Sequence, residues 1–216
     1  MPSSASTEVN LANIALTMLG QQPITALTDT NNRAVMADAR YSDMRDTVLR
    51  AHPWNCAVKR DSLAKSVTAP DWGYSNTFVL PSDFVRLVDI EDPTQKYSIE
   101  AGNQAGDNDL VLLSDANSMN VRYVYKITDV SKMDDTLKQA IATRLAADLA
   151  LAITGDSGKE QFLMQKYQSI LLQAQWEDSV QHNTTDTIHG GLWLESRYDN
   201  AVFRDYPDLN SDGSLT

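Results

Sequence analysis

Hydrophobic residues near the start of the chain recur at the spacing of an α-helix, which predicts two helices. The first is capped by Ser6 or Thr7 and ends at Gly20. The second stops at His52, because a residue that precedes proline avoids the helical conformation. Their apolar stripes are Leu11, Ile14, Ala15, Met18 and Leu19 in the first, and Ala34, Ala37, Tyr41, Met44 and Val48 in the second.

The same helical spacing returns in the second half of the chain. Asp134 is a good N-cap for a third helix that ends at Gly155, and Ser157 with Glu160 matches a capping box for a fourth. Four alanines make the third helix slim enough for close packing, and we expect them to provide faces for lateral packing between subunits. The stripes are Leu137, Ile141, Leu145, Leu149 and Ala152, then Leu163, Tyr167, Ile170, Leu171 and Ala174, and the alanines are Ala140, Ala146, Ala147 and Ala150.

Between these helical pairs the pattern changes to short apolar or alternating runs separated by turn residues. Such runs predict strands that pair as an antiparallel unit. Five are expected, over residues 77–80, 84–90, 97–100, 110–113 and 121–125.

The predicted fold class is therefore α+β and mainly α. We expect a four-helix bundle from both chain ends, with a small antiparallel β insertion and an extended C-terminal arm. The expected divisions are the N-terminal helical pair (1–54), the β insertion (55–130), the C-terminal helical pair (131–180) and the arm (181–216).

The arm is distinguished by aromatic residues in a segment without periodicity. It holds six acidic residues against two arginines, a net charge of −4. A purely solvating tail is poor in aromatics, so we expect this one to pack on another surface, such as a neighbouring subunit. The predicted interface residues are Trp193, Tyr198, Phe203 and Tyr206.

Composition and charge argue against several classes of protein, among them nucleic-acid-binding, membrane-spanning and disulfide-linked proteins. The 216-residue chain has a net charge of −11, and its longest basic grouping is a Lys-Arg pair, so tight binding to a phosphate backbone is not expected. An acidic wall could still let a DNA duplex slide past. No run approaches the ~18 apolar residues of a membrane span, and no secretory leader is expected. The single cysteine, Cys56, excludes an internal disulfide and is expected to fill space in the core.

Candidate catalytic and metal-binding motifs are weak. Residues 208–213 match half of a calcium loop but lack its distal acid, and Asp107 with Asp109 indicates a hairpin turn. His52, His182 and His189 show no metal-binding spacing, and His52 is expected to donate to carbonyls at a helix end. No hydrolase, zinc-protease or phosphate-loop motif occurs. We therefore expect no enzyme, no cofactor and no metal.

The order of several short segments resembles the tail tubular protein A family of short-tailed phages (podoviruses), the head-to-tail adaptors. The resemblance extends over about nine-tenths of the chain, and the sequential order carries most of its weight. The segments are 15–20 (ALTMLG), 23–27 (PITAL), Tyr41, Arg45 and Asp46, 49–55 (LRAHPWN), 78–83 (FVLPSD), 122–125 (RYVY), Thr128 and Asp129, 145–150 (LAADLA) and 193–197 (WLESR).

This resemblance implies a structural virion protein of the tail, assembled in the host cytoplasm. It implies a homo-oligomeric ring, a dodecamer, that joins the portal protein to the tail nozzle protein. Genomic DNA would pass through the bore without specific binding. Two alternatives stay open: a tail component with glycan-hydrolase activity, and a head-completion adaptor of a long-tailed phage.

Overall fold

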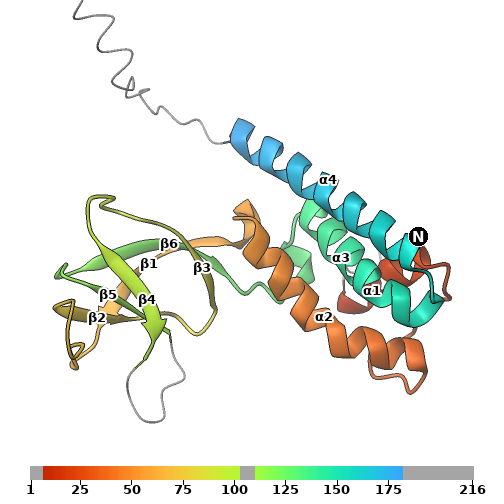
Figure 1. The fold of residues 1–216 in the computed structure, drawn as a ribbon, viewed down its shortest axis with the longest axis horizontal. Coiled ribbons are helices and arrows are strands. Elements are labelled where there is room, and N and C mark those ends of the chain that lie inside the picture. Colours follow the sequence, from red (N-terminus) through yellow and green to blue (C-terminus); the bar gives the residue numbers. More distant parts are fainter. Residues whose placement is uncertain (1–6, 103–109, 182–216) are drawn as a thin grey trace, which may run out of the picture. The chain divides into compact units, whose positions relative to one another are not determined.

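The computed structural model describes residues 7–102 and 110–181, and these form four α-helices and one β-sheet (Figure 1). Two short 3₁₀ helices, Asn55–Ala57 and Val130–Lys132, lie in the connections between the two parts. The α-helices are α1 (Glu8–Met18), α2 (Asn32–Ala51), α3 (Asp135–Thr154) and α4 (Ser157–Gln181).

The helix ends follow from local side-chain chemistry. Thr7 caps α1 and Asp134 caps α3, the latter accepting from the Leu137 amide at 2.6 Å, as predicted. Gly155 ends α3 in the left-handed conformation, with φ of 68°. The predicted capping box of α4 is wrong, because the cap is Asp156, whose carboxylate accepts from the amides of Gly158 and Lys159.

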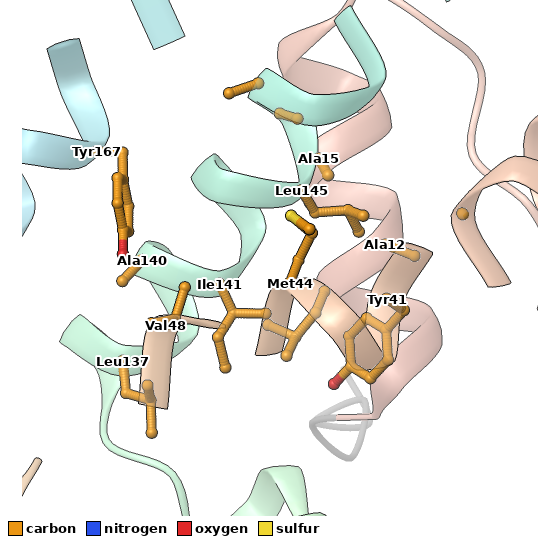
Figure 2. Close-up of a cluster of buried hydrophobic side chains, with 14 of the residues drawn as sticks. Ala12, Ala15, Tyr41, Met44, Val48, Leu137, Ala140, Ile141, Leu145 and Tyr167 are labelled. Carbon is orange, nitrogen blue, oxygen red and sulfur yellow. The ribbon is translucent and has the colours of Figure 1, made fainter. Parts of the chain in front are cut away.

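The helices share one hydrophobic core, and α3 contributes most to it (Figure 2). Ten residues of α3 are buried, and both α1 and α2 pack against this helix. The inner face of α4 adds Leu163, Tyr167, Ile170 and Ala174. Most of the predicted stripe positions are buried, but Ile14 and Ala152 are exposed.

The strands form one antiparallel sheet of six, in the order β3-β6-β1-β2-β5-β4. Strand β1 was not predicted, and it joins β6 on one side to β2 on the other. Their bounds are β1 (Val58–Lys65), β2 (Asn76–Val79), β3 (Phe84–Ile90), β4 (Tyr97–Ala101), β5 (Leu110–Ser114) and β6 (Met119–Tyr125).

This sheet has a hydrophobic core of its own. Phe78 and Leu112 are fully buried in it, and Leu63, Leu80, Met119, Val121 and Tyr123 complete it.

The predicted fold class is therefore wrong. The chain is not a four-helix bundle with a small insertion, because 22% of the structure is strand against 48% helix and the sheet is a curled half-barrel with a separate core.

The helices and the sheet meet along α2 and β3. Arg50 of α2 donates to the Val85 carbonyl at 3.1 Å, and Arg86 of β3 donates back to the Arg50 carbonyl at 3.0 Å. Val124 of β6 is fully buried in the helical core. These contacts connect α2 and the helical core to the sheet.

Candidate interaction surfaces

Helix α4 carries apolar side chains on two faces, of which only one is buried among the described residues. The inner face lies in the helical core. On the outer face, Phe162 is 64% exposed, Leu172 66% and Trp176 68%. By helical spacing these three residues lie on the side of the helix away from the buried stripe. They therefore form a second apolar row and are not the partly exposed margin of the core.

The outer face of α4 also lacks charge. The exposed positions between residues 161 and 176 are glutamines, one serine and the three large apolar residues. Lys166, the one charged residue of that stretch, is partly buried. A solvated helix face normally carries charges, whereas the centre of a protein interface is depleted of them. This face has the composition of a surface that another chain covers.

Sequence reasoning overlooked this outer row because it followed only the stronger, buried stripe. The signal that would have found it is the scarcity of charge over 161–176 in a chain that is 22% charged. The alanines of α3, by contrast, were expected to serve lateral packing between subunits. That expectation is wrong, because Ala140, Ala146, Ala147 and Ala150 are buried inside the chain's own core.

A second exposed apolar feature lies on the sheet. The connection between β1 and β2 folds over strands β2, β5 and β4 and encloses a pocket of about 320 Å³. Val79, Val111 and Leu113 line its sheet side, while Trp72 and Tyr74 come from the connection. Trp72 and Val67, which lies in the same connection, are largely exposed. The pocket also contains two carboxylates, those of Asp71 and Glu100.

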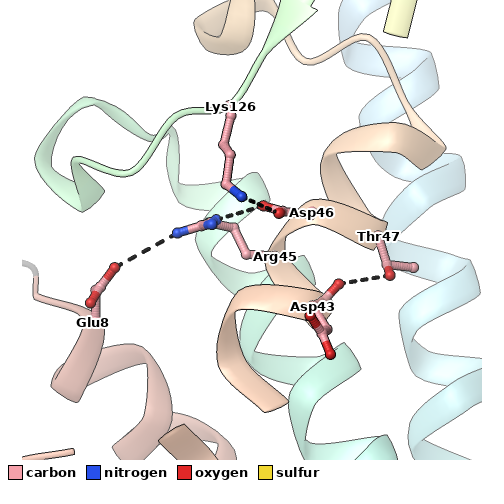
Figure 3. A network of polar contacts seen from close by, with 6 residues as sticks. All are labelled: Glu8, Asp43, Arg45, Asp46, Thr47 and Lys126. Atoms are coloured by element: carbon pink, nitrogen blue, oxygen red, sulfur yellow. Dashed lines mark hydrogen bonds and ion pairs between the residues drawn. The ribbon is translucent and has the colours of Figure 1, made fainter. Parts of the chain in front are cut away.

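A polar network connects α1, α2 and the segment that follows β6 (Figure 3). The buried Arg45 guanidinium lies 2.9 Å from Asp46 and 3.8 Å from Glu8, and Lys126 lies 2.7 Å from the other oxygen of Asp46. Each cation therefore faces a carboxylate, and the network closes the junction between elements distant in sequence. Its groups are mutually satisfied, so we read the network as structural rather than catalytic.

A smaller cluster surrounds Asp83, just before β3. Burial would raise the pKa of its carboxyl, but hydrogen bonds from Lys59 and Tyr123 outweigh burial and hold that pKa below its usual value. Burial and the same carboxylate raise the pKa of Tyr123. Lys59 also lies over the Tyr125 ring, 3.8 Å from its centre. Hydrogen bonds to Asp83 therefore connect β1, β6 and the residue that precedes β3.

Two candidate residues from the sequence, Cys56 and His52, lie among the described residues, and both pack against hydrophobic or aromatic side chains. Cys56 is partly buried against the helical core, and burial raises the pKa of its thiol to about 11. His52 is buried, and its ring packs edge-on against Trp54 with centroids 5.1 Å apart. Across residues 7–102 and 110–181, no group of three or more His, Cys, Asp or Glu side chains is placed to hold a metal ion.

Other candidates lie outside the described residues. They are Asp107 and Asp109, His182 and His189, the 208–213 segment, and the interface residues Trp193, Tyr198, Phe203 and Tyr206. Among the helices that the structure does describe, none combines the length and hydrophobicity needed to span a bilayer.

Comparisons with known proteins add no assignment. No known protein family matches the chain, and no curated protein is significantly similar to it.

Proposed function

We propose that this protein is a structural subunit of a phage head-to-tail adaptor, a ring that joins the portal to the tail nozzle. The order of short segments along the sequence suggests this family. The observation that carries the proposal is the outer face of α4, which is uncharged and apolar although it is exposed in the single chain. A subunit of an assembly needs such a surface, whereas a protein that works alone does not.

The strong negative charge of the chain fits the same role. Twenty-nine acidic residues against eighteen basic ones give the net charge of −11. A ring of acidic subunits repels the phosphates of a duplex in its bore, so that DNA passes without being held. In this proposal the genome is cargo, and neither a cofactor nor a metal takes part.

The exposed apolar residues of the β1–β2 connection support contact with more than one neighbour. Val67 and Trp72 lie in the connection between two strands of the sheet, whereas Phe162 and Leu172 lie on helix α4. An adaptor contacts its own copies and also two different proteins above and below. Separate apolar surfaces are what such a role requires.

The test is to mix the purified protein with its portal and record native mass and electron micrographs. The proposal expects a ring of subunits, a dodecamer, on one end of the portal. A portal that stays bare in both measurements over a wide range of concentrations refutes the adaptor function.

One observation favours a second function. The pocket on the sheet combines an exposed tryptophan with the carboxylates of Asp71 and Glu100, which are the residue types that glycan hydrolysis uses. Turnover of capsule polysaccharide by the purified protein, abolished in Glu100→Gln, would establish this function. The absence of turnover leaves the adaptor as the better account.

A further inference from the structure

Helix α1 has a second uncharged outer face. Residues 9–28 contain no charged residue at all, although the chain as a whole is 22% charged. Ile14 and Thr17 follow one another at helical spacing and are both exposed, Ile14 to 44%, and the half-buried Asn10 lies one turn before Ile14. The turn after α1 continues the pattern, because Gln22 and Pro23 are exposed and neutral. Two hydrogen bonds between Asn13 and the backbone of Ile24 hold this turn against the helix.

The outer face of α2 provides the contrast. Its exposed positions include Asp38, Arg40, Asp43 and Arg50, so this face is charged in the ordinary way. Val35 is 54% exposed, but it stands on that charged helix. Within the described residues, neutrality is therefore a property of the α1 and α4 faces and not of exposed helix surface in general.

Charge indicates what covers these faces. Two copies of a chain with a net charge of −11 repel each other, so an interface between them is favoured where few charges are brought together. A basic partner would be met by exposed carboxylates, and neither face presents any. The glutamine side chains of α4 both donate and accept hydrogen bonds, so they can pair with exposed polar groups such as Gln22 in the turn after α1 and the Thr17 hydroxyl oxygen. A second copy of this chain fits both surfaces.

Ring closure then decides how the two copies meet. A face that pairs with itself gives a closed twofold dimer, whereas a ring requires two different faces that meet head to tail. We propose that the outer face of α4 in one copy packs against the outer face of α1 in the next. This inference rests on the proposed ring and deepens it, because it names the lateral contact.

The dimensions of the two faces agree. From Phe162 to Trp176 the row on α4 is about 21 Å long at 1.5 Å per residue, and α1 with its eleven residues is about 16 Å long. Phe162 stands at one end of the α4 row and Leu172 lies about 15 Å further along the helix, so the two can flank Ile14 of the neighbouring copy. Packed helices lie with their axes ~8–10 Å apart, depending on the side chains at the contact.

The contact is tested by cross-linking of cysteine variants of the full chain. Cys56 is first replaced by Ala, and then Thr17→Cys and Ser169→Cys are made in separate chains, with a short bismaleimide as the reagent. We expect cross-linked dimers when the two variants are mixed, at least about tenfold more than either variant gives alone. Self-linking of Ser169→Cys as the main product would show a twofold contact and overturn the proposal. The absence of mixed dimers would also overturn it.

Three controls distinguish this contact from non-specific linking and from misfolding. Ser42→Cys, on the charged α2 face, should not link to Ser169→Cys. Leu172→Lys should lower the yield of 17–169 dimers by about tenfold, a loss typical of an interface anchor, while Val35→Lys leaves the yield unchanged. Both lysine variants should melt as the parent does, because both side chains are exposed. An equal effect of the two lysines would overturn the proposal.

The alternative partner for the α4 face is the chain's own C-terminal segment, residues 182–216. A shortened chain that ends after Gln181 distinguishes this alternative from a contact between copies. If the yield of cross-links between position 17 of one copy and position 169 of another (17–169 links) is unchanged in the shortened chain, the contact between copies is supported. A large increase would show that residues 182–216 cover α4, which overturns it. The adaptor function is judged separately. Rings on the portal without 17–169 links refute the contact alone, and 17–169 links without portal binding refute the adaptor function alone.

Discussion

The replacement of Leu145 by Ala measures how much of the fold's stability comes from the helical core. Leu145 is fully buried on α3, the helix against which α1 and α2 both pack (Figure 2). Figure 2 shows Ala12 and Ala15 of α1 near Leu145, and their short side chains cannot extend into a cavity at that position. The lost volume should therefore stay largely empty.

The expected magnitude follows from the groups removed. The substitution deletes three carbon atoms, and the loss of transfer free energy at ~0.8 kcal/mol per methylene amounts to about 2.4 kcal/mol. An unfilled cavity adds to this, so we expect roughly 3 kcal/mol within the ~2–5 kcal/mol range of buried leucines. For a chain of this size, each kcal/mol lowers the melting temperature by ~2–4 °C, which gives a shift of about 6–12 °C.

Leu151→Ala is the matched control, because Leu151 lies on the same helix and is 53% exposed. Its unfolding free energy should change by less than ~0.5 kcal/mol. The assay is urea and thermal unfolding of both variants, followed by circular dichroism. If Leu145→Ala and Leu151→Ala unfold at the same urea midpoint, Leu145 is not in the core and α3 does not pack through this face.

Four further predictions concern single groups and the whole surface. The Tyr41 hydroxyl is buried without a hydrogen-bond partner among the described residues, so Tyr41→Phe should raise the unfolding free energy, by up to ~1 kcal/mol; a loss of stability would contradict this. A hydrogen bond and ion pair with Arg40 lower the pKa of Asp148 below its ordinary value of 3.8. The pair therefore stabilises the folded state fully at pH values above 3.8. The Arg40 side chain is 45% exposed and that of Asp148 19%, so the parent should be more stable than Asp148→Asn by only ~0.2–1 kcal/mol. This advantage should vanish as the pH falls through the lowered pKa of Asp148. With its pKa raised to about 11, Cys56 should react with a thiol reagent far more slowly in the folded protein at pH 8 than in denaturant, and equal rates would refute its burial. Finally, the protein should show no measurable affinity for duplex DNA at physiological salt, whereas a submicromolar complex that weakens steeply with salt would contradict this.

Local chemistry allowed much of the helical structure to be predicted from the sequence. The caps Thr7 and Asp134 and the stops at Gly155 and Pro53 act on their own neighbours, so they work the same way in any surroundings. The buried stripes were equally readable, because a helix that packs on one side must repeat its apolar residues every three to four positions.

Strand β1 could not be found in this way. Residues 58–65 carry two lysines, an arginine and an aspartate, and only Leu63 among them is buried. Nothing in that pattern distinguishes a strand from a polar loop. The segment is a strand because β6 and β2 lie on its two sides and supply hydrogen bonds. Without it the strands appear as a small insertion, and with it they become one sheet with its own core.

The candidate interface shows the same division between local and tertiary information. The sequence by itself determined that α4 has an apolar stripe and that charge is scarce along it. Only the tertiary structure decided which side of α4 meets α3 and therefore that Phe162 and Leu172 are left outside. It also decided that the alanines of α3 face the chain's own helices. Periodicity shows that a face will be buried, but the partner that buries it depends on how distant segments pack.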